Sequence, residues 1–217
     1  MLRSMVNNTI TYIKNSHSSH VNVNGYCSHE KRKNLDLEVN RMVWMDLEMT
    51  GLNIETDTIM EVACIITDQN LNIIAEGPDI IIHQPQNVLD NMSEWCKDTH
   101  GKSGLTQECL NSNVSVSEAE EKVMKFLCKF VTEKSSPLAG NSVYMDRMFI
   151  RKYMPKVHEY LHYRIIDVST IKELCRRWNP EVYKSIPKKG FTHRALQDIQ
   201  ESIEELKFYQ NSFFKMA

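Results

Sequence analysis

Long apolar runs are missing from this sequence. No stretch reaches the roughly 18 apolar residues that a membrane-spanning helix requires, so no transmembrane segment is predicted. The 6 cysteines include no Cys-x-x-Cys pair, which argues against a structural zinc site. Positive charge is not in excess either, because the formal net charge is -2. Proteins that cover nucleic acid through phosphate contacts are usually strongly basic, so if this chain handles nucleic acid, it contacts only a few nucleotides.

Acidic residues are absent from residues 1–29, in which Arg3 and Lys14 are the only Lys or Arg. An acid-poor, Ser-rich N-terminus is typical of a mitochondrial transit peptide, although transit peptides usually contain more Arg. A disordered extension explains the same composition, and the sequence does not decide between the two. We therefore expect residues 1–40 to be one of these, with location in mitochondria, the cytoplasm or both. Residues 41–217 are expected to form one domain.

Strand-like patterning begins at Arg41. Three runs rich in β-forming residues follow one another with short polar breaks, and the third is interrupted by Gly77-Pro78. Such a succession favours an antiparallel meander. The three runs cover residues 42–49, 59–68 and 72–84.

Helical and strand signals alternate in the rest of the chain. Ser117 and Glu120 match a capping box at the start of a helix whose apolar residues recur at helical spacing as far as Phe130. Three β runs followed by alternating helices and strands predict an α/β domain with a mixed sheet and helices on both faces. Further strands are expected within residues 137–143 and 163–170, and helices over 146–154, 169–178 and 193–211, with Thr192 capping the last.

The first predicted strand carries two carboxylates, Asp46 and Glu48. Both point to the same face, because side chains alternate along a strand, and the intervening apolar residues occupy the other face. Neighbouring carboxylates repel each other, so each must be solvated, protonated or paired with a cation. Taken alone, the pair also fits a half-exposed strand with an ordinary polar face. The turn at Gly51 brings this strand end to the surface, where ligand sites form in α/β sheets.

Two more acids accompany a histidine later in the chain. Asp146 follows the segment GNSV at a predicted strand-to-helix transition, and Asp198 stands five residues after His193. Positions five apart on a helix are separated by about 140° around the axis, so these two share a site only if His193 lies at the frayed helix start. Each acid alone is compatible with a helix cap or a surface charge. The ordered set DLEMTG, GNSVxxD and HRALxD is more specific than its members.

With these motifs the chain resembles the oligoribonucleases, a branch of the DEDD superfamily of 3′→5′ exonucleases whose fifth catalytic residue is a histidine. The similarity runs from about Arg41 to Tyr209 and is greatest to the animal mitochondrial and cytosolic members. It implies a ribonuclease H-like (DnaQ-like exonuclease) fold with a mixed five-stranded sheet flanked by helices. Other segments that carry the resemblance are EGPDIII, HGKSGLT, PLAGNSV, YLHYRIIDVST, KELCRRW and HRALQDIQESI.

The resemblance implies a catalytic centre with two divalent cations, Mg²⁺ or Mn²⁺. Hard carboxylate oxygens suit both ions. His193 matches the family histidine that acts as general base, a role suited to a side chain that titrates near neutral pH. The four positions that match the family's metal ligands are Asp46, Glu48, Asp146 and Asp198.

The resemblance also implies short single-stranded RNA as substrate, from dinucleotides to pentanucleotides, degraded to nucleoside 5′-monophosphates. Leu52 matches the residue that wedges against the 3′-terminal base, and Trp95 matches an aromatic that stacks on a base. A polar pocket for the substrate's 5′ phosphate would exclude longer chains. Tyr163 would reach this pocket from the other subunit, which implies a homodimer. The positions that match the pocket are His100, Ser142, Tyr163, Arg164 and Ser169.

Three other classes of function deserve comparison. An exonuclease that trims DNA would use the same fold and acids, and some activity on short DNA is expected. A binding module without catalysis would have lost a metal ligand or the histidine, and none is lost here. A purely structural dimerisation protein would leave the clustered acids without an explanation.

Overall fold

The computed structural model describes residues 40–187, 190 and 193–214, and it begins with the predicted antiparallel meander. The strands are β1 (Met42–Met49), β2 (Ile59–Thr67) and β3 (Ile73–Ile81). β3 continues through Gly77-Pro78, where we expected a break. The pairing of β2 with β3 shifts register there instead, because Gly77 lies so close to β2 that a Cβ would be 2.6 Å from the Cys64 carbonyl oxygen.

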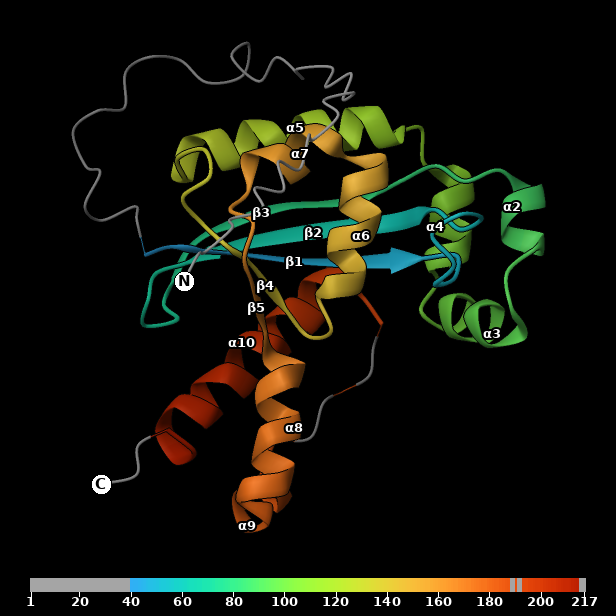
Figure 1. Cartoon of the computed structure of the whole chain (residues 1–217). Coiled ribbons are helices and arrows are strands. Elements are labelled where there is room, and N and C mark those ends of the chain that lie inside the picture. The colour runs from blue at the N-terminus through green and yellow to red at the C-terminus, as the bar shows by residue number, and fades with distance from the viewer. Residues whose placement is uncertain (1–39, 188–189, 191–192, 215–217) are drawn as a thin grey trace, which may run out of the picture.

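Two short strands complete a mixed sheet. β4 (Leu138–Gly140) runs parallel to β1, and β5 (Ile165–Asp167) runs parallel to β4. The strand order is β3-β2-β1-β4-β5 (Figure 1). β1, with its two carboxylates, is therefore the central strand, and the predicted five-stranded α/β sheet is confirmed.

Helices cover both faces of the sheet (Figure 1). One layer contains α5 (Val116–Phe130), α6 (Tyr144–Tyr153) and α7 (Pro155–Tyr160), which pack against Val43, Met45 and Leu47 of β1. The other contains α8 (Val168–Trp178) and α10 (Ala195–Ser212), which pack against Trp44. The alternation along β1 thus divides the apolar side chains between two cores and leaves Asp46 and Glu48 on the α10 face.

The capping box of α5 lies two residues earlier than predicted. The Ser115 hydroxyl accepts a hydrogen bond from the Glu118 backbone N–H at 3.2 Å, and a Glu118 carboxylate oxygen accepts one from the Ser115 backbone N–H at 2.8 Å. The predicted pair of Ser117 and Glu120 has the same spacing, so the pattern alone did not distinguish them. Glu120 is buried and instead accepts a hydrogen bond from the Lys156 backbone N–H at the start of α7, at 2.6 Å.

Helices for which the sequence analysis assigned no element lie at one end of the sheet. These are α2 (Gln86–Asp90), α3 (Glu94–Lys102) and α4 (Leu105–Asn111), beside the carboxyl end of β1 (Figure 1). They share a small apolar core with Met60 of β2. A further short helix, α9 (Pro180–Lys184), lies between α8 and α10, where no element was predicted.

The last helix begins at Ala195, so His193 precedes it rather than belonging to it. Its predicted cap, Thr192, and the N-terminal segment discussed above, apart from Asn40, lie outside the described residues. Within the described part of the chain, no helix is both long and apolar enough to cross a membrane.

Candidate active site

Three separate segments bring acidic side chains and a histidine to the carboxyl end of β1. Asp146, in the first turn of α6, lies close enough to β1 for its carboxylate to accept a hydrogen bond from the Leu47 backbone N–H at 3.0 Å. One possible ligand atom from each of Glu48, His193 and Asp198 falls within 4.8 Å of the others. The structure therefore assembles in space the residues that the sequence presents in three distant motifs.

His193 reaches this cluster because of its backbone conformation. It has a φ of 51° and stands just before α10, whereas Asp198 lies in the first turn of that helix. A left-handed φ is uncommon for a residue with a Cβ and reverses the chain direction locally. The separation of about 140° that a regular helix would impose is thus avoided, as the frayed-start interpretation requires.

Charge repulsion and burial act together on the carboxylates. Burial raises the pKa of Glu48 to about 8, and the negative charges of Asp198, Glu61 and Asp146 add to the rise. Burial likewise raises the pKa of Asp146, although the Leu47 hydrogen bond opposes it. Acids that resist ionisation in the absence of a counter-charge fit a centre that holds cations, because a bound cation offsets both effects.

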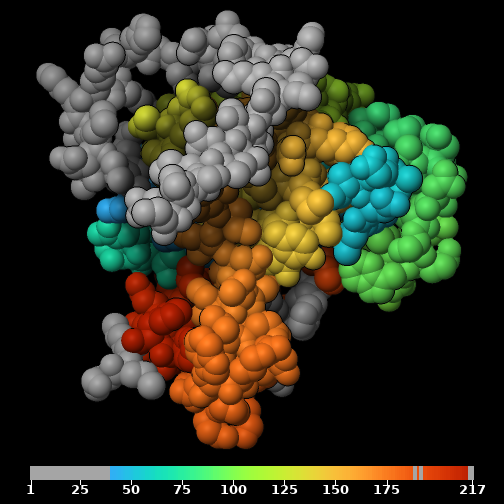
Figure 2. Space-filling view, in the orientation of Figure 1, coloured from blue at the N-terminus to red at the C-terminus, as the bar shows by residue number. Residues whose placement is uncertain are grey.

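A cleft of about 1060 Å³ opens over these residues. Leu52, 66% exposed, follows β1 on one side of it, and Trp95, 63% exposed, projects from α3. The Trp95 and His193 rings meet edge to face, with centroids 5.7 Å apart. Figure 2 shows the loop after β1 lying against the segment that contains α2 and α3. The predicted site residues that line this cleft are Asp46, Glu48, Leu52, Trp95, His100, Ser142, Asp146, His193 and Asp198.

His100 is buried beside Glu48. Its Nε2 donates to the Met49 carbonyl oxygen at 3.0 Å, and its Nδ1 lies 3.9 Å from a Glu48 carboxylate oxygen. Burial lowers the pKa of His100, and the nearby His193 acts in the same direction. The Nδ1 of His100 is therefore turned towards Glu48.

Ser142 and Ser169 meet at another part of the site. The Ser142 backbone N–H donates to the Ser169 hydroxyl at 2.9 Å and to an Asp167 carboxylate oxygen at 3.0 Å. The two hydroxyls are 3.1 Å apart, and Ser142 has a φ of 52°. This network joins the turn after β4 to the start of α8, and it holds the Ser169 hydroxyl beside Ser142, which lines the cleft.

Tyr163 and Arg164 do not belong to the lining of this cleft in the single chain. Tyr163 is 74% exposed, and the Arg164 guanidinium lies over its ring, 5.3 Å from the centroid. The sequence analysis expected Tyr163 to act across a subunit boundary, and its exposure is compatible with that role. Of the predicted residues, these two alone stand apart from the cluster and its contacts.

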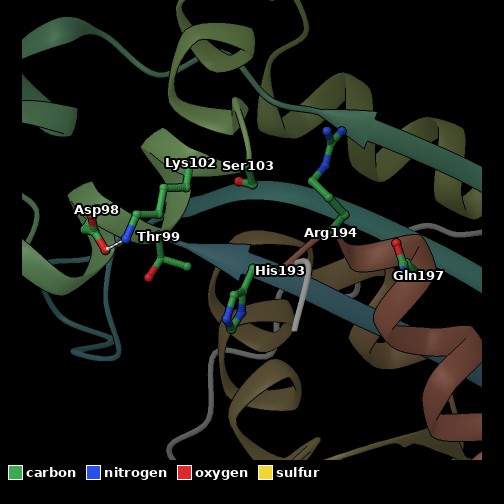
Figure 3. Close-up of a pocket in the computed structure, with 7 residues that line it drawn as sticks. All are labelled: Asp98, Thr99, Lys102, Ser103, His193, Arg194 and Gln197. Atoms are coloured by element: carbon green, nitrogen blue, oxygen red, sulfur yellow. Dashed lines mark hydrogen bonds and ion pairs between the residues drawn. The ribbon is translucent and has the colours of Figure 1, made fainter. Parts of the chain in front are cut away.

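A second pocket lies beside His193, and neither this pocket nor the ion pair beside it was predicted from the sequence. A pocket of about 620 Å³ adjoins His193 on the side of α3, where Lys102 forms an ion pair with Asp98 (Figure 3). Arg194 also lines it and forms an ion pair with Glu61. Glu61 is a lone charge in the apolar run IMEVACIIT, a signal that could have drawn attention to it.

The chain is similar in sequence to an exonuclease family and to proteins named oligoribonuclease. A family model described as Exonuclease (RNase_T) matches residues 43–206. Mitochondrial oligoribonuclease of Homo sapiens is 58% identical over 175 residues, which cover 81% of this chain and 74% of the human protein. Oligoribonuclease of Chromobacterium violaceum is 50% identical over 179 residues, or 82% of this chain and 98% of the bacterial one.

Known structures share the fold. Exonuclease I from Methylocaldum szegediense superposes with a TM-score of 0.62 at 18% identity. The match covers 81% of this chain but only 41% of that longer protein, so it supports the fold and nothing more. The sequence matches show that the chain belongs to the RNase_T exonucleases and, among them, to the oligoribonucleases.

Proposed function

We propose that this protein is a 3′→5′ exoribonuclease that hydrolyses very short oligoribonucleotides to nucleoside 5′-monophosphates. The observation that carries the proposal is the convergence of Glu48, Asp198 and His193 within 4.8 Å, with Asp146 hydrogen-bonded to the same strand. The names of the relatives at 50–58% identity point to the same substrate class.

Divalent cations fit the donor set of this centre. Asp46, Glu48, Asp146 and Asp198 would hold two of them, Mg²⁺ or Mn²⁺, because hard carboxylate oxygens suit these ions. The raised pKa of Glu48 supports the same assignment, since a bound cation would stabilise the ionised form. When bound, such ions stabilise charge on the attacking and leaving oxygens and make water more acidic.

His193 would act as the general base, and its proximity to Glu48 and Asp198 supports this role. One of its ring nitrogens accepts a proton from the attacking water, whose oxygen forms a bond to the terminal phosphorus. The bond from that phosphorus to the 3′ oxygen of the preceding nucleotide breaks, and this oxygen takes up a proton from solvent. The products are a nucleoside 5′-monophosphate and a chain one nucleotide shorter. The edge contact with Trp95 limits the orientations open to the His193 ring.

Two exposed apolar side chains would bind bases without reading their sequence. Trp95 would stack on one base, and each such stack contributes about 1–3 kcal/mol. Leu52 would wedge against the 3′-terminal base. Both line the same cleft as the acidic cluster, which supports an arrangement with the 3′ end at the cleavage centre.

A polar pocket for the 5′ phosphate would account for a preference for short chains. The hydroxyls of Ser142 and Ser169 offer hydrogen bonds at one part of the cleft. Arg164 would contribute charge, since a guanidinium binds phosphate in a bidentate manner. In a homodimer, the exposed Tyr163 of the second subunit would complete the pocket. His100 would be a further residue of the same pocket.

Domain boundaries and location are part of the same proposal. Residues 41–217 would form the exonuclease domain, and residues 1–40 would be a disordered extension or a mitochondrial transit peptide. Relatives with 58% identity are named as mitochondrial proteins, which supports mitochondria as one location. The cytoplasm is the other.

The direct test is hydrolysis of end-labelled RNA of two, five and twenty nucleotides, with a DNA dinucleotide in parallel, in Mg²⁺ or Mn²⁺ and after chelation. We expect metal-dependent release of monophosphates from the two shorter RNAs, little from the longest, and loss of activity in Asp198→Ala and His193→Ala. Equal attack on all lengths would refute the phosphate pocket. Preference for DNA would refute the substrate class, and absence of metal-dependent release would refute the enzyme.

A further inference from the structure

The residues that follow His193 are held by a single buried carboxylate. The Arg194 Nε donates to Glu61 Oε1 at 3.1 Å, and the Ala195 backbone N–H donates to Glu61 Oε2 at 3.2 Å. A second Arg194 nitrogen lies 3.0 Å from Glu108 of α4. Both oxygens of Glu61 are therefore engaged by the two residues that connect His193 to α10.

Glu61 is itself part of the sheet that carries the acidic cluster. It is fully buried on β2, directly opposite Glu48 in the pairing of β1 with β2. A buried carboxylate is costly unless it is paired and hydrogen-bonded. The Glu61 carboxylate links the start of α10 to β2, the strand that pairs with β1 at Glu48. An apolar side chain of similar size could not form these hydrogen bonds.

The conformation of His193 requires such a link. Its φ of 51° is strained for a residue with a Cβ, and strained conformations persist only where the surroundings hold them. Figure 3 shows the His193 and Arg194 side chains pointing in different directions from neighbouring positions. An anchor on Arg194 therefore leaves the His193 ring turned towards the cluster, against Trp95.

We propose that Glu61 and Arg194 are positioning residues for the reaction, and that their ion pair holds His193 in the orientation in which it accepts the proton from water. The inference rests on the proposed role of His193 as general base. Neither Glu61 nor Arg194 lines the cleft. Replacing them should therefore lower the turnover rate and leave the binding of RNA unchanged.

Glu61→Gln tests the two hydrogen bonds of Glu61 most directly. The site needs two acceptor oxygens, one for Arg194 and one for Ala195, and an amide supplies only one. The NH₂ group of the glutamine must face either Arg194 or the Ala195 N–H, so one of the two hydrogen bonds is lost with almost no change in side-chain volume. Arg194→Gln removes the other partner, and Arg194→Lys keeps the charge but loses the bidentate geometry.

A matched control exists on the opposite face of the sheet. Glu120 is also a buried carboxylate that accepts from a backbone N–H at a helix start, in this case Lys156 of α7. It also lies 3.9 Å from the Lys156 ammonium. Glu120→Gln therefore imposes a comparable structural loss away from His193.

The experiment measures kcat and KM of each variant for an RNA dinucleotide in Mn²⁺, together with the unfolding temperature of the protein. We expect Glu61→Gln and Arg194→Gln to lower kcat about 10- to 100-fold with KM unchanged, Arg194→Lys to fall between, and Glu120→Gln to lower only the unfolding temperature. Wild-type kcat in the folded Glu61→Gln and Arg194→Gln proteins would overturn the proposal, as would an equal loss in Glu120→Gln.

A second readout needs neither metal nor catalysis. The His193 ring resonances, assigned by their loss in His193→Ala, carry a shift caused by Trp95 that Trp95→Leu removes. In the metal-free protein, we expect Glu61→Gln and Arg194→Gln to reduce this shift and Glu120→Gln to leave it. An unchanged shift would refute the positioning role. Full activity of His193→Ala would instead refute the proposed general base, so the two failures are distinguishable.

Discussion

Replacing Glu48, one carboxylate of the acidic cluster, should stabilise the metal-free protein. In the folded chain burial and neighbouring acids raise the pKa of Glu48 from 4.5 to about 8. The folded state therefore binds an extra proton between these pH values, and its stability falls as the pH rises through this window. Below it both states are protonated, and above it both are ionised, so the full penalty is present above about pH 8.

The size of the effect follows from the same values. A tenfold change in proton affinity corresponds to about 1.4 kcal/mol, so the penalty at high pH has an upper limit of about 5 kcal/mol for a pKa that moves from 4.5 to about 8. Glu48→Gln removes the ionisation and keeps the shape. For a domain of this size, each kcal/mol shifts the unfolding temperature by about 2–4 °C.

The assay is thermal unfolding in excess chelator at pH 5 and pH 8. Wild type should lose stability between the two, and Glu48→Gln should lose less and be the more stable protein at pH 8; the loss that remains comes from Asp146, whose pKa burial also raises. Glu94→Gln, which alters an exposed glutamate of α3, should behave as wild type. Saturating Mn²⁺ should reverse the order of wild type and Glu48→Gln. A Glu48→Gln protein less stable than wild type at pH 8 without metal would refute the electrostatic reasoning.

Three further predictions concern the cleft and its surroundings. Gly51→Ala should lower the free energy of unfolding by about 1–3 kcal/mol, because the added Cβ would lie 2.5 Å from an Asp57 carboxylate oxygen. Gly101→Ala should raise the free energy of unfolding, because Gly101 lies in α3 with open space around it. Urea denaturation of the two variants compares them. Trp95→Ala should raise KM for an RNA dinucleotide by roughly 5- to 150-fold with little change in stability, and an unchanged KM in steady-state kinetics would contradict stacking. Ser169→Ala should reduce the rate advantage of a 5′-phosphorylated over an unphosphorylated dinucleotide about 5-fold, measured by competition between the two.

Much of this architecture follows from local patterns. The alternation along β1 predicted both its buried face and the shared face of Asp46 and Glu48, because a strand has a period of two residues. The meander and the later helices were likewise visible in hydrophobic spacing. The order of these elements also predicted a mixed sheet with helices on both faces, whereas its five-stranded architecture came from the family resemblance, since spacing alone does not specify strand order.

Other features depend on contacts that no local pattern encodes. The capping box of α5 was placed on Ser117 rather than Ser115 because two overlapping motifs satisfy the same spacing. Helices α2 to α4 were missed, and they are stabilised by a small core shared with β2.

The conformation of His193 was the least predictable part of the site. Its convergence with Asp198 needs a left-handed backbone, and that backbone depends on Glu61, which is distant in sequence. Helical spacing alone therefore pointed away from a shared site. Prediction failed where tertiary contacts override local preference.

The position of α10 in the chain has a consequence for protein synthesis. This helix carries Asp198 and packs across β1 and β2, so it closes the cluster that the first strand begins. A growing chain on the ribosome presents β1 long before α10 exists. Asp198 therefore joins Asp46 and Glu48 only after α10 has been synthesised and has docked on the sheet.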